Sequence, residues 1–159
     1  MVASPAVSFA MLRGLPSQQW VRIEVPRGSF VKRTPTGALD FISPLPCPYN
    51  YGSVVGPDGR VETAARGSDG DPLDALVLGP RLVAGTLVAT TVRAVFGFCD
   101  AGVEDPKLVC SDAPLSSRER AGVERFFAAY AWLKRAVHRV RGEGGATRAL
   151  GWLPYEPPA

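Results

Sequence analysis

Acidic side chains crowd two short segments of the chain, and the spacing of the first suits a divalent cation. Residues 69–74 read Asp-Gly-Asp-Pro-Leu-Asp and hold three carboxylates: Asp69, Asp71 and Asp74. Neighbouring carboxylates repel one another, and a cation offsets that cost most directly. Because oxygen-only ligands favour hard ions, the segment predicts a site for Mg²⁺, with Mn²⁺ as the substitute ion. An EF-hand Ca²⁺ loop is excluded, since Pro80 stands where the loop needs its last Glu.

The second acidic cluster lies at 100–107, where Asp100, Glu104 and Asp105 precede Lys107. Two carboxylate clusters suit a site with several metal ions, which clamp a phosphate and lower the pKa of a bound water. A lysine beside them adds a positive charge for a phosphate oxygen. Each cluster alone is also typical of a solvated turn, so the prediction depends on their combination.

The basic residues are mostly arginines, which draws attention to the few lysines. The chain has 159 residues, a formal net charge of +3 and 18 basic side chains, of which only Lys32, Lys107 and Lys134 are lysines. A mild positive charge favours an anionic partner, either a phosphate substrate or a nucleic acid. Arg and Lys are not interchangeable where a compact point charge is needed, so lysines within motifs are candidate ligands.

The remaining metal-binding residue types indicate no further metal chemistry. Cys47, Cys99 and Cys110 lack the spacing of a metal site, and an odd count without a secretory signal indicates buried thiols in a reducing, cytoplasmic environment. His138, the single histidine, cannot build a zinc site and is predicted to lie on the surface near a helix C-terminus. No apolar run approaches the roughly 20 residues of a membrane span, so we expect no membrane association.

Short strands and one helix are predicted to position these groups. Apolar patterns predict strands at 20–25, 38–42, 51–55, 73–78, 86–98 and 107–110, the fifth long enough to curve around a barrel. Ser116 or Ser117 caps a helix that ends at Gly142. Its predicted apolar stripe is Val123, Phe126, Phe127, Tyr130, Leu133, Val137 and Val140.

The domain organisation follows from these elements. We predict one domain over 1–159 of α+β class, mainly β, in which a C-terminal helix closes or buttresses a small barrel. Residues 1–18 are predicted to be a flexible extension and residues 142–159 an irregular tail, because the tail is rich in Gly and Pro.

The order of motifs over residues 20–135 resembles that of the soluble, family I type inorganic pyrophosphatases. The segment 69–74 followed by an apolar strand matches the family's signature. Residues 48–52 (Pro-Tyr-Asn-Tyr-Gly) are similar to its Pro-x-Asn-Tyr-Gly, and residues 104–109 to its Glu-Asp-x-Lys segment. Residues 23–26 (Ile-Glu-Val-Pro), followed by Lys32, and residues 126–130 (Phe-Phe-Ala-Ala-Tyr) extend the match.

The resemblance implies a distorted five-stranded barrel of OB type with packed helices, usually in a homo-oligomer. It also implies hydrolysis of inorganic diphosphate to two orthophosphates with several Mg²⁺ ions. Asp71 matches the residue thought to accept a proton from the nucleophilic water. The implied metal-site residues are Asp69, Asp71, Asp74, Asp100 and Asp105, with Glu24 in support. The implied phosphate ligands are Lys32, Tyr51, Lys107 and Tyr130.

The chain departs from the family's pattern at several positions, some of them phosphate-binding. Residues 34–50 contain no Arg or Lys, so the Arg that the family places before its Asn-Tyr-Gly is missing. Ala131 stands where the family has a Lys after the helical Tyr. Thr34 and Ala101 replace acidic residues, and Cys47 replaces a Tyr. Lys134, one helical turn after Tyr130, is predicted to substitute for the missing Lys.

Two alternative functions remain open from the sequence. The first is hydrolysis of a different phosphoanhydride or of a phosphate ester with an organic group. It would suit the phosphate position that lacks the family's Arg, where the loop before Asn-Tyr-Gly is also shorter than in the family. The other alternative is a catalytically lapsed OB-like module that binds anions or nucleic acid. An acidic predicted groove, without interleaved aromatic and basic residues on the strands, argues against nucleic acid.

Overall fold

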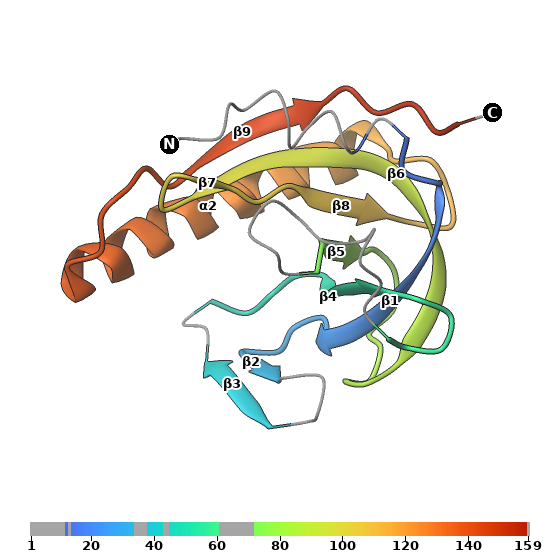
Figure 1. Ribbon diagram of the computed structural model, residues 1–159, viewed down its shortest axis with the longest axis horizontal. Helices are drawn as coiled ribbons and strands as arrows, with labels where there is room; N and C mark the ends of the chain where they lie inside the picture. The colour runs from blue at the N-terminus through green and yellow to red at the C-terminus, as the bar shows by residue number, and fades with distance from the viewer. Residues whose placement is uncertain (1–11, 13, 34–37, 43–44, 61–71, 159) are drawn as a thin grey trace.

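Five strands close into a barrel in the computed structural model, which describes residues 12, 14–33, 38–42, 45–60 and 72–158 (Figure 1). The strands are β1 (Gln18–Val25), β4 (Asn50–Val55), β5 (Asp74–Val77), β6 (Leu87–Asp100) and β8 (Lys107–Cys110). Their order is β1-β4-β5-β8-β6, and β6 pairs with β1 to complete the circle. Only the β5–β8 pair of this circle is parallel. The predicted mainly β, five-stranded OB-like barrel is therefore confirmed.

The strand β6 is the longest and joins most of the sheet. Its first half pairs with β1, and its second half pairs with β8 and with two further strands, β7 (Val103–Glu104) and β9 (Arg148–Leu153). A separate hairpin of β2 (Val31–Arg33) and β3 (Leu39–Ile42) stands beside the barrel (Figure 1). The prediction of an irregular tail over 142–159 is wrong for β9, which adds to the sheet beside β6.

The apolar residues of the strands divide into two packed clusters. One fills the barrel and includes Val21, Ile23 and Val95, with Leu12 and Leu15 from the N-terminal segment. The other lies between the barrel and the helix and includes Phe96, Phe98 and Phe127. Because Leu12 and Leu15 are buried, the predicted flexible extension does not reach to residue 18.

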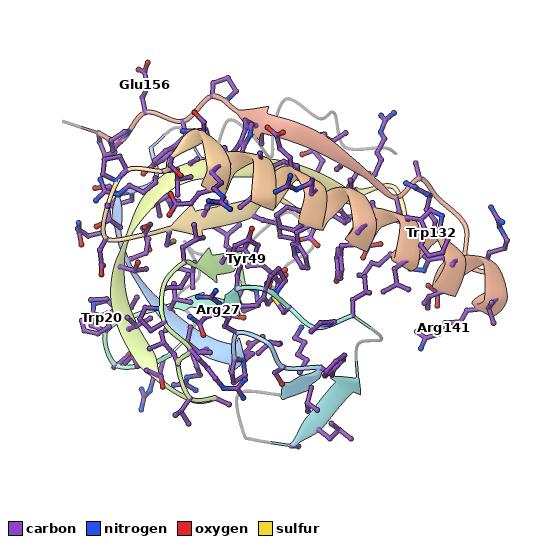
Figure 2. The ribbon with its side chains drawn as sticks, turned by 180° about the vertical axis from the view of Figure 1, so that it is seen from behind. Trp20, Arg27, Tyr49, Trp132, Arg141 and Glu156 are labelled. Atoms are coloured by element: carbon purple, nitrogen blue, oxygen red, sulfur yellow. The ribbon has the colours of Figure 1, made fainter. Side chains whose placement is uncertain are left out.

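The single helix among the described elements, α2 (Ser117–Arg141), packs along the outside of the barrel (Figures 1 and 2). Ser116 and Glu119 form a reciprocal capping box, and Gly142 ends the helix with a φ of 69°. Val123, Phe127 and Ala131 are buried, whereas Val140 is 89% exposed, so the predicted apolar stripe does not extend to the helix C-terminus. Trp132 and Arg141 lie toward the end of α2 that extends beyond the barrel (Figure 2).

No helix in the described ranges has both the length and the apolar character needed to cross a lipid bilayer.

Candidate functional site

Lys107 is the centre of the predicted site and is almost completely buried, with 2% of its side chain exposed. It opens β8, directly beside Asp74, which opens the parallel neighbour β5. Its Nζ donates to Asp74 Oδ2 at 2.6 Å, to Asp105 Oδ2 at 2.6 Å and to Tyr51 Oη at 3.0 Å. Two carboxylates from separate segments therefore converge on one ammonium group. The sequence predicted Asp74, Asp105 and Lys107 as residues of one site, but not these contacts.

The electrostatics of this group keep Asp74 and Lys107 charged. Burial favours the neutral form of Asp74, but Lys107 and Tyr51, with Lys32 at longer range, lower its pKa below the ordinary value. Burial also opposes the charge on Lys107, yet Asp74 and Asp105 raise its pKa. Burial and the neighbouring carboxylates raise the pKa of Tyr51, which stays a neutral phenol. The Asp74 carboxylate and the buried Lys107 ammonium group therefore stay charged.

Asp100, at the end of β6, binds a second group of cationic side chains. Lys134 donates to Asp100 Oδ2, and His138 Nε2 lies 2.8 Å from Asp100 Oδ1. Thr147 Oγ1 donates to the same Oδ1 at 3.3 Å and accepts from the Ala101 backbone N–H at 2.9 Å. The sequence predicted Asp100 and Lys134 as site residues, but not their contact.

Glu24 and Lys32 form a third polar group. Glu24 Oε1 accepts from Ser53 Oγ at 2.6 Å, and Lys32 Nζ lies 3.9 Å from Glu24 Oε2. Glu24 is 6% exposed and lies where the pairing of β1 with β4 shifts register, between Ile23 and Val25. Lys32, on the β2–β3 hairpin, also lowers the pKa of Asp74, so this group lies within electrostatic reach of the first.

The aromatic residues join the first two groups. The Phe98 ring lies 5.8 Å from Lys107 Nζ and 5.6 Å from the Tyr130 ring. The Tyr130 ring in turn lies 5.4 Å from Lys134 Nζ, which confirms that Tyr130 and Lys134 share a helix face. Lys107 opposes the charge on Lys134 electrostatically. The rings of Phe98 and Tyr130 therefore lie between the ammonium groups of Lys107 and Lys134.

Asn50 opens β4, the strand that carries Tyr51, and its side chain holds several backbone segments together. Asn50 is fully buried, and its side-chain amide donates to the carbonyls of Val77 and Pro80. Its Oδ1 accepts from the backbone N–H groups of Arg27 and Leu82. These four bonds give the Asn of the Asn-Tyr-Gly motif a structural role.

The preceding residue, Tyr49, lies between the barrel and α2, with its ring 5.7 Å from that of Phe126 (Figure 2).

Two of the predicted metal ligands, Asp69 and Asp71, lie outside the described residues. Within the part that is described, no group of three or more His, Cys, Asp or Glu side chains is arranged to hold a metal ion. Asp74 and Asp105 lie side by side at the Lys107 ammonium group, and both offer only oxygen ligands. That donor set fits a hard divalent cation.

His138 lies in the last turn of α2, as predicted, but it is partly buried and not a free surface residue. Its side chain is only 17% exposed, and its Nδ1 lies 2.5 Å from Glu143 Oε2 while Nε2 faces Asp100. Its position one helical turn after Lys134 was the available signal, since residues four apart on a helix share a face. The partner, Asp100, is far away in sequence and was not predictable from that spacing.

We expect His138 to make the stability of the metal-free protein depend on pH. The bond to Asp100, opposed by burial, and the bond to Glu143 raise the pKa of His138 above 6.5 in the folded state. Its stabilising contribution is therefore full below a pH of about 6.5 and is lost as the pH rises through the folded-state pKa. Urea unfolding in EDTA should show a larger difference between wild type and His138→Gln at a pH of about 5.5 than at about 9. A difference that stays constant across this range contradicts the account.

The three cysteines show no sign of a reactive site. Burial raises the pKa of Cys110 to about 12 and, opposed by a backbone hydrogen bond, that of Cys47 to about 11. Cys99 is partly buried, and its thiol donates to the Ala146 carbonyl at 3.5 Å. Cys47 and Cys110 therefore fit the predicted buried thiols, and Cys99 does so only in part.

Known proteins resemble this chain in both sequence and fold. A family model described as inorganic pyrophosphatase matches residues 21–152. Inorganic pyrophosphatases from Corynebacterium efficiens and Corynebacterium glutamicum are each 31% identical, over 81% of this chain and 88% of theirs. The structure of an inorganic pyrophosphatase from Helicobacter pylori is 26% identical with a TM-score of 0.63, covering 86% of this chain and 84% of that one. One from Thermus thermophilus shares the fold at 24% identity, with a TM-score of 0.65 over 89% and 88% of the two chains.

Proposed function

Because this chain belongs to the inorganic pyrophosphatase family, we propose that it hydrolyses inorganic diphosphate to two orthophosphates in the presence of Mg²⁺. The observation that carries the proposal is the buried Lys107, held between Asp74 and Asp105 and in contact with Tyr51. Family membership implies a divalent metal cofactor, and the oxygen donors of these aspartates favour Mg²⁺ over softer ions.

The acidic residues are proposed to hold the metal ions. The set consists of Asp69, Asp71, Asp74, Asp100 and Asp105, with Glu24 in support. Bound ions would neutralise phosphate charge and lower the pKa of a water molecule. Asp74 and Asp105 come from separate segments and meet at the Lys107 ammonium group. Their negative charge favours cations at this place. Ser53 orients Glu24 through a hydrogen bond of 2.6 Å.

The basic and phenolic residues are proposed to hold the oxygens of diphosphate. Lys107 and Tyr51 lie at the centre, and Lys32, Tyr130 and Lys134 complete the set. An ammonium group has three donors, so Lys134 can bind Asp100 and still donate to a phosphate oxygen. Phosphoryl transfer spreads charge over the equatorial oxygens, and catalysis depends mainly on positioning and charge neutralisation. The lysines supply the positive charge, and the strands and helix that carry them supply the positioning.

Asp71 is proposed to accept the proton of the attacking water. It stands three residues before Asp74, between Gly70 and Pro72, in a sequence that favours a tight turn. A carboxylate near other acidic groups and near metal ions can remain ionised and take up a proton as the water attacks. General-base groups of this kind contribute about 10²- to 10⁴-fold to the rate.

The organisation of the enzyme is proposed on the same basis. A single domain over residues 1–159 carries the whole site, and the protein works in the cytoplasm as a homo-oligomer. The odd cysteine count and the buried thiols of Cys47 and Cys110 support a reducing compartment.

Release of orthophosphate from diphosphate tests the proposal. We expect millimolar Mg²⁺ to be required, and Asp71→Asn to lower the rate by about 10²- to 10⁴-fold. Asp112→Asn is the matched control, because Asp112 is exposed and is expected to leave the rate unchanged. If the folded protein releases no phosphate with Mg²⁺, or if both variants keep the wild-type rate, the proposal is wrong.

A further inference from the structure

The contacts of Asp100 differ in kind from those of the other predicted metal-site residues. Asp74 and Asp105 share Lys107, a residue that matches the family's pattern. Asp100 instead faces the ammonium group of Lys134 and the imidazole of His138, at positions outside that pattern. Both belong to α2 and lie four residues apart, which places them on one helix face, and both contact Asp100 at the end of β6.

We propose that Lys134, supported by His138, acts as a resident cation on Asp100 and competes with a divalent ion for that carboxylate. The inference rests on the proposed function, in which Asp100 is one of the metal ligands. A divalent ion should therefore bind at Asp100 more weakly in this chain than it would if Lys134 did not contact the carboxylate.

The geometry around Asp100 engages both carboxylate oxygens. Lys134 bonds to Oδ2, while His138 at 2.8 Å and Thr147 at 3.3 Å bond to Oδ1. The Asp100 side chain is 21% exposed and that of Lys134 is 30% exposed, so neither is fully hydrated. A divalent ion that approaches Asp100 must displace one of these contacts and lie close to an ammonium group, which repels it.

The cationic side chains are themselves held in place. His138 Nδ1 lies 2.5 Å from Glu143 Oε2, which fixes the ring between two carboxylates. Lys134 lies over the Tyr130 ring, with its Nζ 5.4 Å from the ring centre. Thr147 connects Asp100 to the Ala101 backbone through a bond of 2.9 Å. An ammonium group held by several elements competes better than a freely mobile one, because it loses less entropy on binding.

Direct measurement of Mn²⁺ binding tests the proposal without any substrate. Isothermal titration calorimetry of the full chain, at one pH and ionic strength, gives the affinity of each bound ion. We expect Lys134→Met to tighten the binding of one Mn²⁺ by at least about tenfold, since the loss of one charge-assisted contact is worth that much. Lys134→Arg keeps the charge and is expected to leave the binding curve close to that of wild type.

A double variant assigns the effect to Asp100. Adding Asp100→Asn to Lys134→Met should cancel the gain in Mn²⁺ affinity, because the gain depends on the carboxylate that Lys134 no longer contacts. The proposal is overturned if Lys134→Met leaves Mn²⁺ binding unchanged or weakens it, or if the double variant keeps the gain. Should Lys134→Met fail to fold, as judged by circular dichroism, Lys134→Gln replaces it in the same series. These results are independent of diphosphate hydrolysis, so failure of the proposed activity leaves the binding test intact.

Discussion

Replacing Lys107 with Met is expected to lower the free energy of unfolding in EDTA by about 3–5 kcal/mol. The substitution leaves Asp74 and Asp105 facing each other without the ammonium group that lies 2.6 Å from each. Removing one partner from a buried ionic group leaves uncompensated charge in a poorly hydrated place. Urea unfolding followed by circular dichroism measures the change. Excess Mg²⁺ should restore part of the lost stability, because an ion that binds only the folded state stabilises it.

Lys32→Met provides the matched control for this experiment. Lys32 is 35% exposed and lies 3.9 Å from Glu24, so its loss should cost about 1 kcal/mol or less. The two substitutions remove the same chemical group from a buried and from a partly exposed position. Equal stability of the two variants in EDTA would contradict the role given to Lys107.

Replacing Gly52 with Ala is expected to cost more than about 4 kcal/mol and to prevent stable folding. A Cβ atom at this position would lie 1.9 Å from the Arg22 carbonyl oxygen and 2.7 Å from its carbon. Those are backbone atoms of β1, which pairs with β4 at Ile23 and Gly52, so neither can move without opening the barrel. The yield of folded protein and the urea midpoint measure the effect.

Gly144→Ala is the control for the same substitution at an open position. A Cβ atom on Gly144 meets nothing within 4 Å, so the change should stay within about 0.5 kcal/mol. A Gly52→Ala protein that unfolds at the wild-type urea concentration would show that β1 and β4 do not approach so closely.

The fold was predictable where local patterns and tertiary packing agree. The alternation in β1, the long apolar β6 and the Ser116 cap of α2 each match the structure within a few residues. The strand β9 was not predicted, because Gly151 interrupts it and Pro residues follow it. It forms by pairing with β6, about fifty residues earlier in the chain, and such a long-range pairing cannot be predicted from local patterns. The same reason explains the buried Leu12 and Leu15.

The site was predictable only in part, for a similar reason. Motif spacing identified Asp74, Asp105 and Lys107, and the parallel pairing of β5 and β8 brings them together. The contacts of Asp100 with α2 join segments more than thirty residues apart, and no motif records them. A resemblance to a family indicates which residues share a function. It does not indicate what a residue outside the family's pattern, such as His138, binds.

Substrate selectivity tests the central claim most directly. The catalytic efficiency, kcat/KM, would be measured with Mg²⁺ for inorganic diphosphate, for ATP and for a phosphate monoester such as phenyl phosphate. We expect diphosphate to be hydrolysed most efficiently, even though residues 34–50 contain no Arg or Lys and Ala131 stands where the family has a lysine. Faster turnover of ATP or of the monoester would contradict it, and would show that the altered phosphate position accepts an organic group.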